Sequence, residues 1–221
     1  VGLVPVFGLA MPAVQPSQTA RAAISVKDII LRNPRISLSM SVAALSQAVM
    51  VLLMTPTPLA MVGCGFVETQ AADVIRWHVV AMFAPGFFTG WFIARFGAGR
   101  IATCGVSLLL VAALTAWIGM ELLNFYAALI VLGVGWNFAF VSATHILQSE
   151  LNDDEAPLLQ GANDTILAIA SAVASLISGA LYMGVGWVGL ATFALPVPVV
   201  IGFLLLQAQR RTPPSNITVS E

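Results

Sequence analysis

Long apolar stretches constrain the fold of this chain more than any other feature of its sequence. A helix needs about 20 residues to cross a hydrocarbon core of roughly 30 Å, and six of the stretches are about that long or longer. They are Ile36 to Met61, Ala72 to Phe96, Ile101 to Gly119, Leu122 to Leu147, Pro157 to Met183 and Trp187 to Gln207. The runs are continuous rather than alternating, which excludes the strands of a membrane barrel. The sequence therefore predicts an all-α polytopic transmembrane helical bundle.

Composition agrees with a membrane protein and excludes one class of partner. Only 9% of the residues are charged and 59% are hydrophobic, whereas an ordinary soluble domain carries about 25% charged residues. The formal net charge is −1, so the chain lacks the excess of basic residues that neutralises phosphates, and no nucleic acid partner is expected. Membrane lipid is the expected surroundings of the bundle.

The segments on either side of the bundle, which is expected at residues 36–207, differ from it in character. Residues 1–13 are apolar but too short to span a bilayer, and we interpret them as the end of a preceding transmembrane helix. Residues 14–35 are polar and are expected to form a cytoplasmic connector. Residues 208–221 are rich in proline and polar residues, which is typical of a disordered tail.

Basic residues orient the six predicted spans. Eight of the nine fall on one side of the membrane if the spans alternate: Arg21, Lys27, Arg32, Arg35, Arg95, Arg100, Arg210 and Arg211. The loops on the other side contain no Lys or Arg. By the positive-inside rule the eight mark the cytoplasm. We therefore expect a multi-pass protein of the cell inner (plasma) membrane with its carboxyl terminus in the cytoplasm.

A short motif separates the second span from the third. It reads GWFIARFGAGR. Gly90, Arg95, Gly97 and Arg100 resemble the signature that the major facilitator superfamily of secondary transporters carries after its second helix and, more weakly, after its eighth. Ala94 replaces the acidic residue of that signature, which is typical of the second, weaker copy. The two glycines are expected to let the helix backbones approach closely at this turn.

The resemblance covers nearly the whole chain. A connector, six spans, the signature and a basic tail together resemble helices seven to twelve, the carboxyl-terminal half of such a transporter. The stretches MTPTPLAM, WHVVAMFAPGFFTG and LGVGWNFAFV resemble an uncharacterised bacterial subgroup of the family. The resemblance implies secondary active transport of a small-molecule substrate by alternating access, with the missing amino-terminal six-helix half as partner. The sequence has no ATP-binding signature, so an ion gradient, most simply of protons, would supply the energy.

The resemblance also implies a gating role for the motif, because cytoplasmic charge networks latch the outward-facing state in this family. We expect Arg95 to pair with Glu150 or Asp164. The alternatives are that Arg95 and Arg100 only anchor the topology, and that Asp164 is stabilised only by the dipole of its own helix.

Ionisable residues inside a span are candidates for the substrate pathway, since burying one in hydrocarbon costs roughly 2.5 to 3.5 kcal/mol. Arg76 and His78 lie in the outer half of the second span. Arg76 would contact an anionic substrate, and His78 would bind substrate or carry a proton near neutral pH. Alternatively, Arg76 pairs with Asp73 at the outer interface, and His78 is hydrogen-bonded to a neighbouring helix.

Two uncharged polar residues at mid-span complete the predicted pathway. Asn137 lies beside Trp136 in the fourth span, and Gln47 lies in the first. Each can instead form a hydrogen bond between helices.

Two other classes of function remain beside transport. A membrane scaffold or sensor on the same bundle is one alternative. An intramembrane enzyme is the weaker one, because the sequence has no His-Glu-x-x-His, no Gly-x-Ser-x-Gly and no pair of membrane aspartates. We expect no catalytic residues, no metal site and no cofactor.

Overall fold

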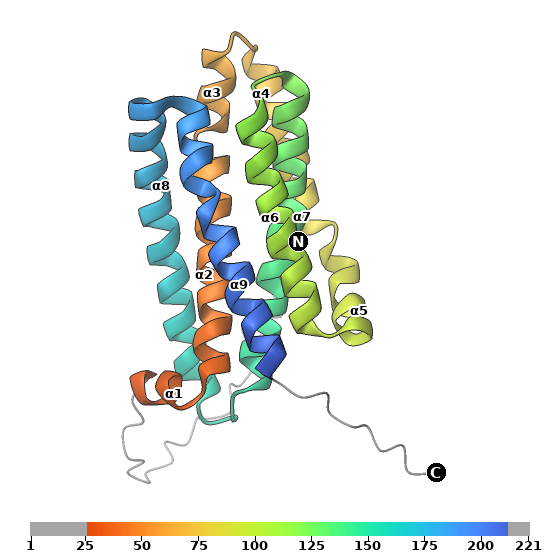
Figure 1. Ribbon diagram of the computed structural model, residues 1–221, viewed down its shortest axis with the longest axis vertical. Coiled ribbons are helices and arrows are strands. Elements are labelled where there is room, and N and C mark those ends of the chain that lie inside the picture. Colours follow the sequence, from red (N-terminus) through yellow and green to blue (C-terminus); the bar gives the residue numbers. More distant parts are fainter. Residues whose placement is uncertain (1–25, 212–221) are drawn as a thin grey trace, which may run out of the picture.

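A computed structural model describes residues 26–211 of the chain. The predictions of a preceding helix, of most of the connector and of most of the tail lie outside the described residues. The elements are α1 (Val26–Arg32), α2 (Pro34–Met54), α3 (Thr57–Gly63), α4 (Glu68–Phe83), α5 (Gly86–Phe96), α6 (Ala98–Ile118), α7 (Leu122–Ser149), α8 (Ala156–Ala194) and α9 (Pro196–Arg211). Residues 26–211 therefore form a helical bundle, as predicted (Figure 1).

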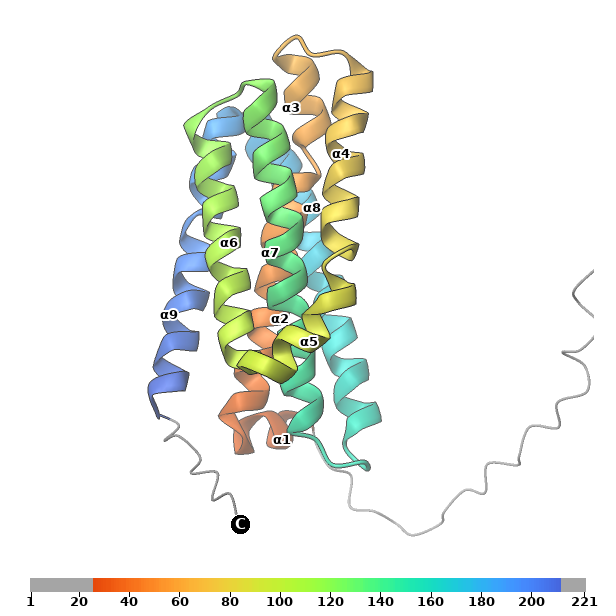
Figure 2. The same cartoon turned by 90° about the vertical axis from the view of Figure 1, so that its right-hand side faces the viewer.

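Prolines divide two of the predicted spans into shorter helices. Pro56 and Pro58 lie where α2 passes into α3, and Pro85 separates α4 from α5. Proline removes a backbone donor and its ring clashes with the preceding turn, so an otherwise continuous helix breaks or bends there. After Pro85, α5 turns away from the direction of α4 (Figure 2).

The apolar segment from Ala156 to Arg210 has 55 residues, which is long enough for two crossings. Gly186 interrupts α8 with φ 70° and ψ −172°, a conformation that only glycine adopts readily. The chain reverses there, and the end of α8 and α9 return along the bundle (Figure 1). Within residues 26–211, the six predicted crossings are thus present.

The last crossing is longer than expected. Residues 208–211 continue α9, whereas the sequence predicts that the disordered tail begins at residue 208. Gln209 explains the extension, because its amide nitrogen donates to the carbonyl of Gly99 and the hydroxyl of Thr103, both at 2.8 Å, and so ties the end of α9 to α6.

Two central helices, α2 and α7, hold the bundle together. α7 packs against α6, α4 and α2, while α8 packs mainly against α2, and α9 covers α6 and α2 (Figures 1 and 2). The core between them is apolar, with Leu53, Leu109, Leu129 and Leu190 fully buried. Burial in lipid gives such helices no hydrophobic drive to associate, so close packing must hold them together.

Glycines permit the closest contacts of α7. A Cβ atom on Gly105 of α6 would lie 2.3 Å from the backbone nitrogen of Ala139, and one on Gly135 would lie 2.9 Å from that of Leu109. On another side of α7, a Cβ atom on Gly133 would lie 2.8 Å from the carbonyl oxygen of His78 in α4. Gly133 and Gly135 therefore permit close helix packing.

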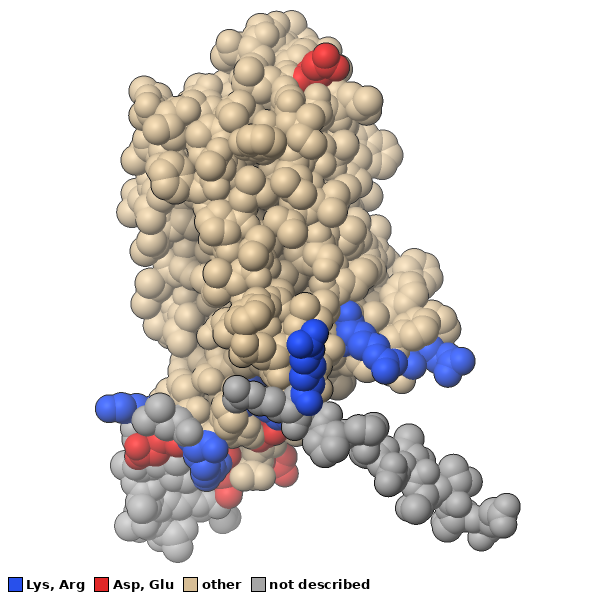
Figure 3. Space-filling view, in the orientation of Figure 1, with Lys and Arg blue, Asp and Glu red and all other residues tan. Residues whose placement is uncertain are grey.

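A cluster of charged and polar groups, which we call the charge clamp, joins α1 and the start of α2 to the α7–α8 loop. Arg32 bonds to Glu155 at 2.8 Å, and Glu150 accepts from Arg35 at 2.9 Å and from the Asn33 amide at 2.8 Å. Most basic side chains of the described part gather at this end of the molecule (Figure 3), as the orientation by the positive-inside rule requires.

The glycine contact between α6 and α7 predicts that an added methyl group lowers the stability at this contact and not at an open glycine. Gly105→Ala should force these two backbones apart and lower the melting temperature of the detergent-purified protein, with a cost of about 1 to 3 kcal/mol. Gly184→Ala is the matched control, because a Cβ there meets nothing within 4 Å and alanine is the better helix former. Equal melting temperatures for the two variants would contradict the close contact.

The charge clamp predicts a stability that depends on pH. Hydrogen bonds from Arg35, and then from Asn33, hold the pKa of the Glu150 carboxyl below its ordinary value of 4.5. Because the folded-state pKa is the lower one, the carboxylate stabilises the fold above its ordinary pKa, and this contribution is lost as the pH falls through the folded-state value. Glu150→Gln should lower the melting temperature near neutral pH and flatten its fall in acid. Asp153→Asn, an exposed change outside the clamp, should leave the profile as it is.

Candidate functional site

The candidate site is a hydrogen-bonded chain of three side chains at mid-span, which we call the Gln47 cluster. The Trp136 indole of α7 donates to the Gln47 side-chain oxygen of α2 at 2.8 Å, and the Gln47 amide nitrogen donates to the Ser171 hydroxyl of α8 at 3.0 Å. The indole also stacks on Phe140, with ring centroids 4.9 Å apart and planes 16° apart. All four residues are half-buried. The cluster therefore presents amide, hydroxyl and aromatic groups at the edge of three helices.

One exposed flank of α8 continues this polar edge. It is made of small or polar residues at helical spacing next to Ser171: Gln160, Gly161, Asp164, Ala168, Ala172, Ser175 and Gly179. The other exposed flank of the same helix carries large apolar residues: Leu158, Ile166, Ile169, Val173, Leu176 and Ile177. The second flank suits lipid. The first, which we call the small-residue flank, suits contact with another protein segment or with water.

Asn137, the predicted pathway residue next to Trp136, points elsewhere. Its amide nitrogen donates to the carbonyl of Met82 at 2.8 Å, and its oxygen accepts from the Thr89 hydroxyl at 2.6 Å. Met82 lies near the carboxyl end of α4, where carbonyls lack helical partners because Pro85 breaks the helix. The buried Asn137 thus joins α7 to the break between α4 and α5. This is the alternative in which Asn137 forms a hydrogen bond between helices.

The structure separates Arg76 from His78. Arg76 has a side chain that is 70% exposed, and it pairs with Asp73, which also accepts from the Tyr126 hydroxyl at 2.5 Å. His78 is fully buried, with Nδ1 2.6 Å from the carbonyl oxygen of Leu129 in α7. A carbonyl only accepts, so Nδ1 carries the hydrogen, while Nε2 has no partner among the described residues. Neither residue reaches the Gln47 cluster by a contact of its own.

The glycines of the motif between α5 and α6 do not have the role that the sequence analysis predicts. Gly97 adopts φ 88°, and added Cβ atoms at Gly97 and Gly90 would meet nothing within 4 Å. The expectation that these two glycines prevent a backbone collision is wrong for this structure. Gly97 is needed for its left-handed φ, because it ends α5 and caps α6.

The predicted latch partners do not meet here. Glu150 belongs to the charge clamp, and Asp164 lies on the small-residue flank of α8. Arg95 and Arg100 are exposed beside the α5–α6 turn, and α5 packs on α6 and α7 rather than on α8. Among the described residues no ion pair joins Arg95 to either carboxylate. The gating role of the motif stays a prediction.

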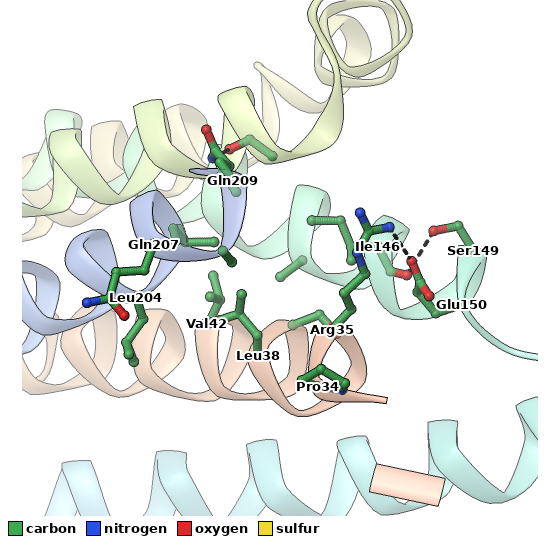
Figure 4. Close-up of a pocket in the computed structure, with 16 residues that line it drawn as sticks. Pro34, Arg35, Leu38, Val42, Ile146, Ser149, Glu150, Leu204, Gln207 and Gln209 are labelled. Atoms are coloured by element: carbon green, nitrogen blue, oxygen red, sulfur yellow. Dashed lines mark hydrogen bonds and ion pairs between the residues drawn. The ribbon is translucent and has the colours of Figure 1, made fainter. Parts of the chain in front are cut away.

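One pocket within residues 26–211 lies away from the predicted pathway. It has a volume of about 500 Å³ and lies between α2, α6, α7 and α9, at the end of the bundle that carries the charge clamp. Arg35 and Glu150 point toward one another at one side of it, and Leu38, Val42 and Leu204 form its apolar wall (Figure 4). Among residues 26–211 no group of three or more potential metal-ligating side chains occurs.

Comparison with known proteins identifies the family. The chain is 41% identical over 172 residues to the riboflavin transporter RfnT of Brucella anthropi, a match that covers 78% of this chain and 43% of the relative. It is also similar to two transporters of Bacillus subtilis that are described as uncharacterised and MFS-type. These are YdeG, 31% identical over 73% of this chain and 39% of the relative, and YddS, 30% identical over 81% and 43%.

The chain thus spans less than half the length of the curated relatives that it matches. No protein-family model matches it, and no solved structure does. The relatives agree with the resemblance of the motif and with the bundle of membrane-length helices. On this evidence the chain is a multi-pass membrane protein that belongs to the major facilitator superfamily and matches part of its transporters.

Proposed function

We propose that this chain is the carboxyl-terminal half of a secondary transporter that moves a small planar compound of the riboflavin type by alternating access. The observation that carries the proposal is the Gln47 cluster, which places hydrogen-bonding side chains at mid-span beside an exposed, non-lipid-like helix flank. Transporters of this class bind substrate near the midplane, at the interface of two repeats. The name of the 41% identical relative supports riboflavin as the substrate to test first.

The small-residue flank of α8 supports the second part of the proposal, the partner. Small residues let helix backbones approach, and polar ones seek hydrogen bonds away from lipid. In the proposed assembly an amino-terminal six-helix half lies against this flank. Substrate then contacts the Gln47 cluster from one half and side chains of the other half from the opposite side.

The energy source in this proposal is a proton gradient. The ionisable groups within the spans support it, and the given sequence carries no ATP-binding signature. Arg95 and Arg100 remain candidates for gating, with carboxylates of the other half as partners. The proposed orientation places the basic end and the carboxyl terminus in the cytoplasm of a cell whose inner membrane holds the protein.

Thiol labelling tests the orientation. Cys64 is exposed at the end of α3, at the end of the bundle opposite the charge clamp, whereas Cys104 is exposed within the spanning helix α6. A membrane-impermeant maleimide should label intact cells through Cys64, and Cys64→Ser should abolish the labelling while Cys104→Ser retains it. Labelling of Cys64 only after the membrane is opened would reverse the proposed orientation.

Uptake measurements test the site. Gln47→Leu leaves the Trp136 indole and the Ser171 hydroxyl without their partner, and each lost hydrogen bond costs about 0.5 to 1.5 kcal/mol. We expect uptake of radiolabelled riboflavin by the complete transporter to fall by roughly tenfold or more, with normal amounts of protein in the membrane. Leu176→Ala, on the apolar flank of α8, is the control and should transport normally. Normal uptake by Gln47→Leu would remove this cluster from the pathway.

A further inference from the structure

An open depression lies on the surface of α7 and begins at Phe140, one helical turn beyond Trp136. It has a volume of about 250 Å³ and is lined by Phe140, Val141, Thr144, His145 and Gln148. Phe140 joins the pocket to the cluster, because its ring stacks on Trp136, whose indole nitrogen is bonded to Gln47. We call it the Phe140 pocket.

The surface of the Phe140 pocket is almost entirely apolar, and two of the residues that line it carry exposed polar side chains. The Thr144 hydroxyl donates to the carbonyl of Phe140 at 3.0 Å. The His145 ring and the Gln148 amide are exposed, and no hydrogen bond of either side chain occurs among the described residues. Both groups carry donors and acceptors of hydrogen bonds. Two such side chains therefore project from a helix whose other exposed groups at this level are apolar or internally bonded.

We infer that the Phe140 pocket binds the planar ring system of the substrate, a fused heteroaromatic ring with nitrogen and carbonyl groups on its edge. Phe140 stacks on the face of this ring, and His145 and Gln148 hydrogen-bond to its edge. The inference rests on the proposed function and goes beyond it, because it says which part of the substrate this half recognises and with which residues.

Two features of the geometry favour a ring over a sugar-like chain. The Phe140 ring is already held in place by its stack on Trp136, so binding a planar face costs little reorganisation. Aromatic faces stack on planar π systems, whereas the hydroxyl groups of a polyol gain more from hydrogen-bonding side chains. A polyol would instead need a dense set of polar contacts, and this pocket provides only the two free polar side chains.

The size of the pocket agrees with recognition of one moiety. Sites that enclose a whole drug-sized ligand measure about 300 to 1,000 Å³, and the Phe140 pocket is smaller. The remainder of the substrate then extends toward the Gln47 cluster and the proposed amino-terminal half.

Competition on the unmodified complete transporter is the first test. Riboflavin uptake is measured in the presence of lumichrome, which has the fused ring without the ribityl chain, or of ribitol, which has the chain without the ring. We expect lumichrome to inhibit uptake and ribitol to have no effect at the same concentration. Inhibition by ribitol but not by lumichrome would overturn ring recognition, and this test needs no variant that might misfold.

Variants then assign the pocket. Phe140→Leu and Gln148→Leu should each raise the KM for riboflavin by roughly three- to tenfold, the effect of losing one stacking or hydrogen-bonding contact, and should weaken inhibition by lumichrome in parallel. Phe140→Tyr keeps the aromatic face and should stay near the unmodified value. Phe203→Leu, the same change at an exposed residue of α9, is the matched control.

The outcomes separate this inference from the proposed function. Riboflavin uptake with an unchanged KM in both Phe140→Leu and Gln148→Leu would overturn the pocket assignment and leave transport standing. Equal effects of Phe203→Leu and Phe140→Leu would also overturn it. No uptake of riboflavin by the unmodified protein would overturn the proposed substrate and this inference together.

Discussion

The arrangement of the bundle depends on the backbone contacts of α7. Gly135 brings α7 against α6, and Gly133 brings it against α4, at separations that leave no room for a Cβ atom. Trp136 and Asn137 follow these glycines directly, so the rotation of α7 that closes both contacts also fixes where these two side chains point. Trp136 meets Gln47 of α2, and Asn137 meets the break between α4 and α5. The candidate site is therefore a consequence of helix packing.

Much of the fold follows from the apolar runs, because a membrane imposes a minimum helix length and excludes unpaired backbone. The prediction that one crossing ends near Met183 and the next begins at Trp187 is confirmed by the reversal at Gly186. The basic residues gather at one end, as their spacing indicated. The end of α9 differs, since the contacts of Gln209 with α6 hold the helix together beyond its apolar part.

The candidate site was harder to predict, because helices that are apolar on every side do not reveal which face meets which neighbour. The mid-span position of Gln47 makes it a candidate from the sequence alone, whereas nothing in the sequence distinguishes its partner Ser171 from other small residues of α8. Pro85 is a signal in the sequence, because a helix that is broken by proline needs a hydrogen-bond donor for its free carbonyls. The Asn137 amide supplies that donor. Gly90 and Gly97 were linked to close packing, yet Gly97 is required only for its backbone conformation.

α8 connects the charge clamp to the candidate site. Its amino-terminal end is held at Glu155 by Arg32, and its middle is held at Ser171 by Gln47. Between these points its small-residue flank has no neighbour within the described part of the chain, and α2 is its main packing partner. A helix that is fixed at two points and open along one polar flank suits a rigid wall against which a second bundle can rock. In the proposed assembly, the rocking motion would then open and close the Gln47 cluster and the Phe140 pocket without repacking the six crossings themselves.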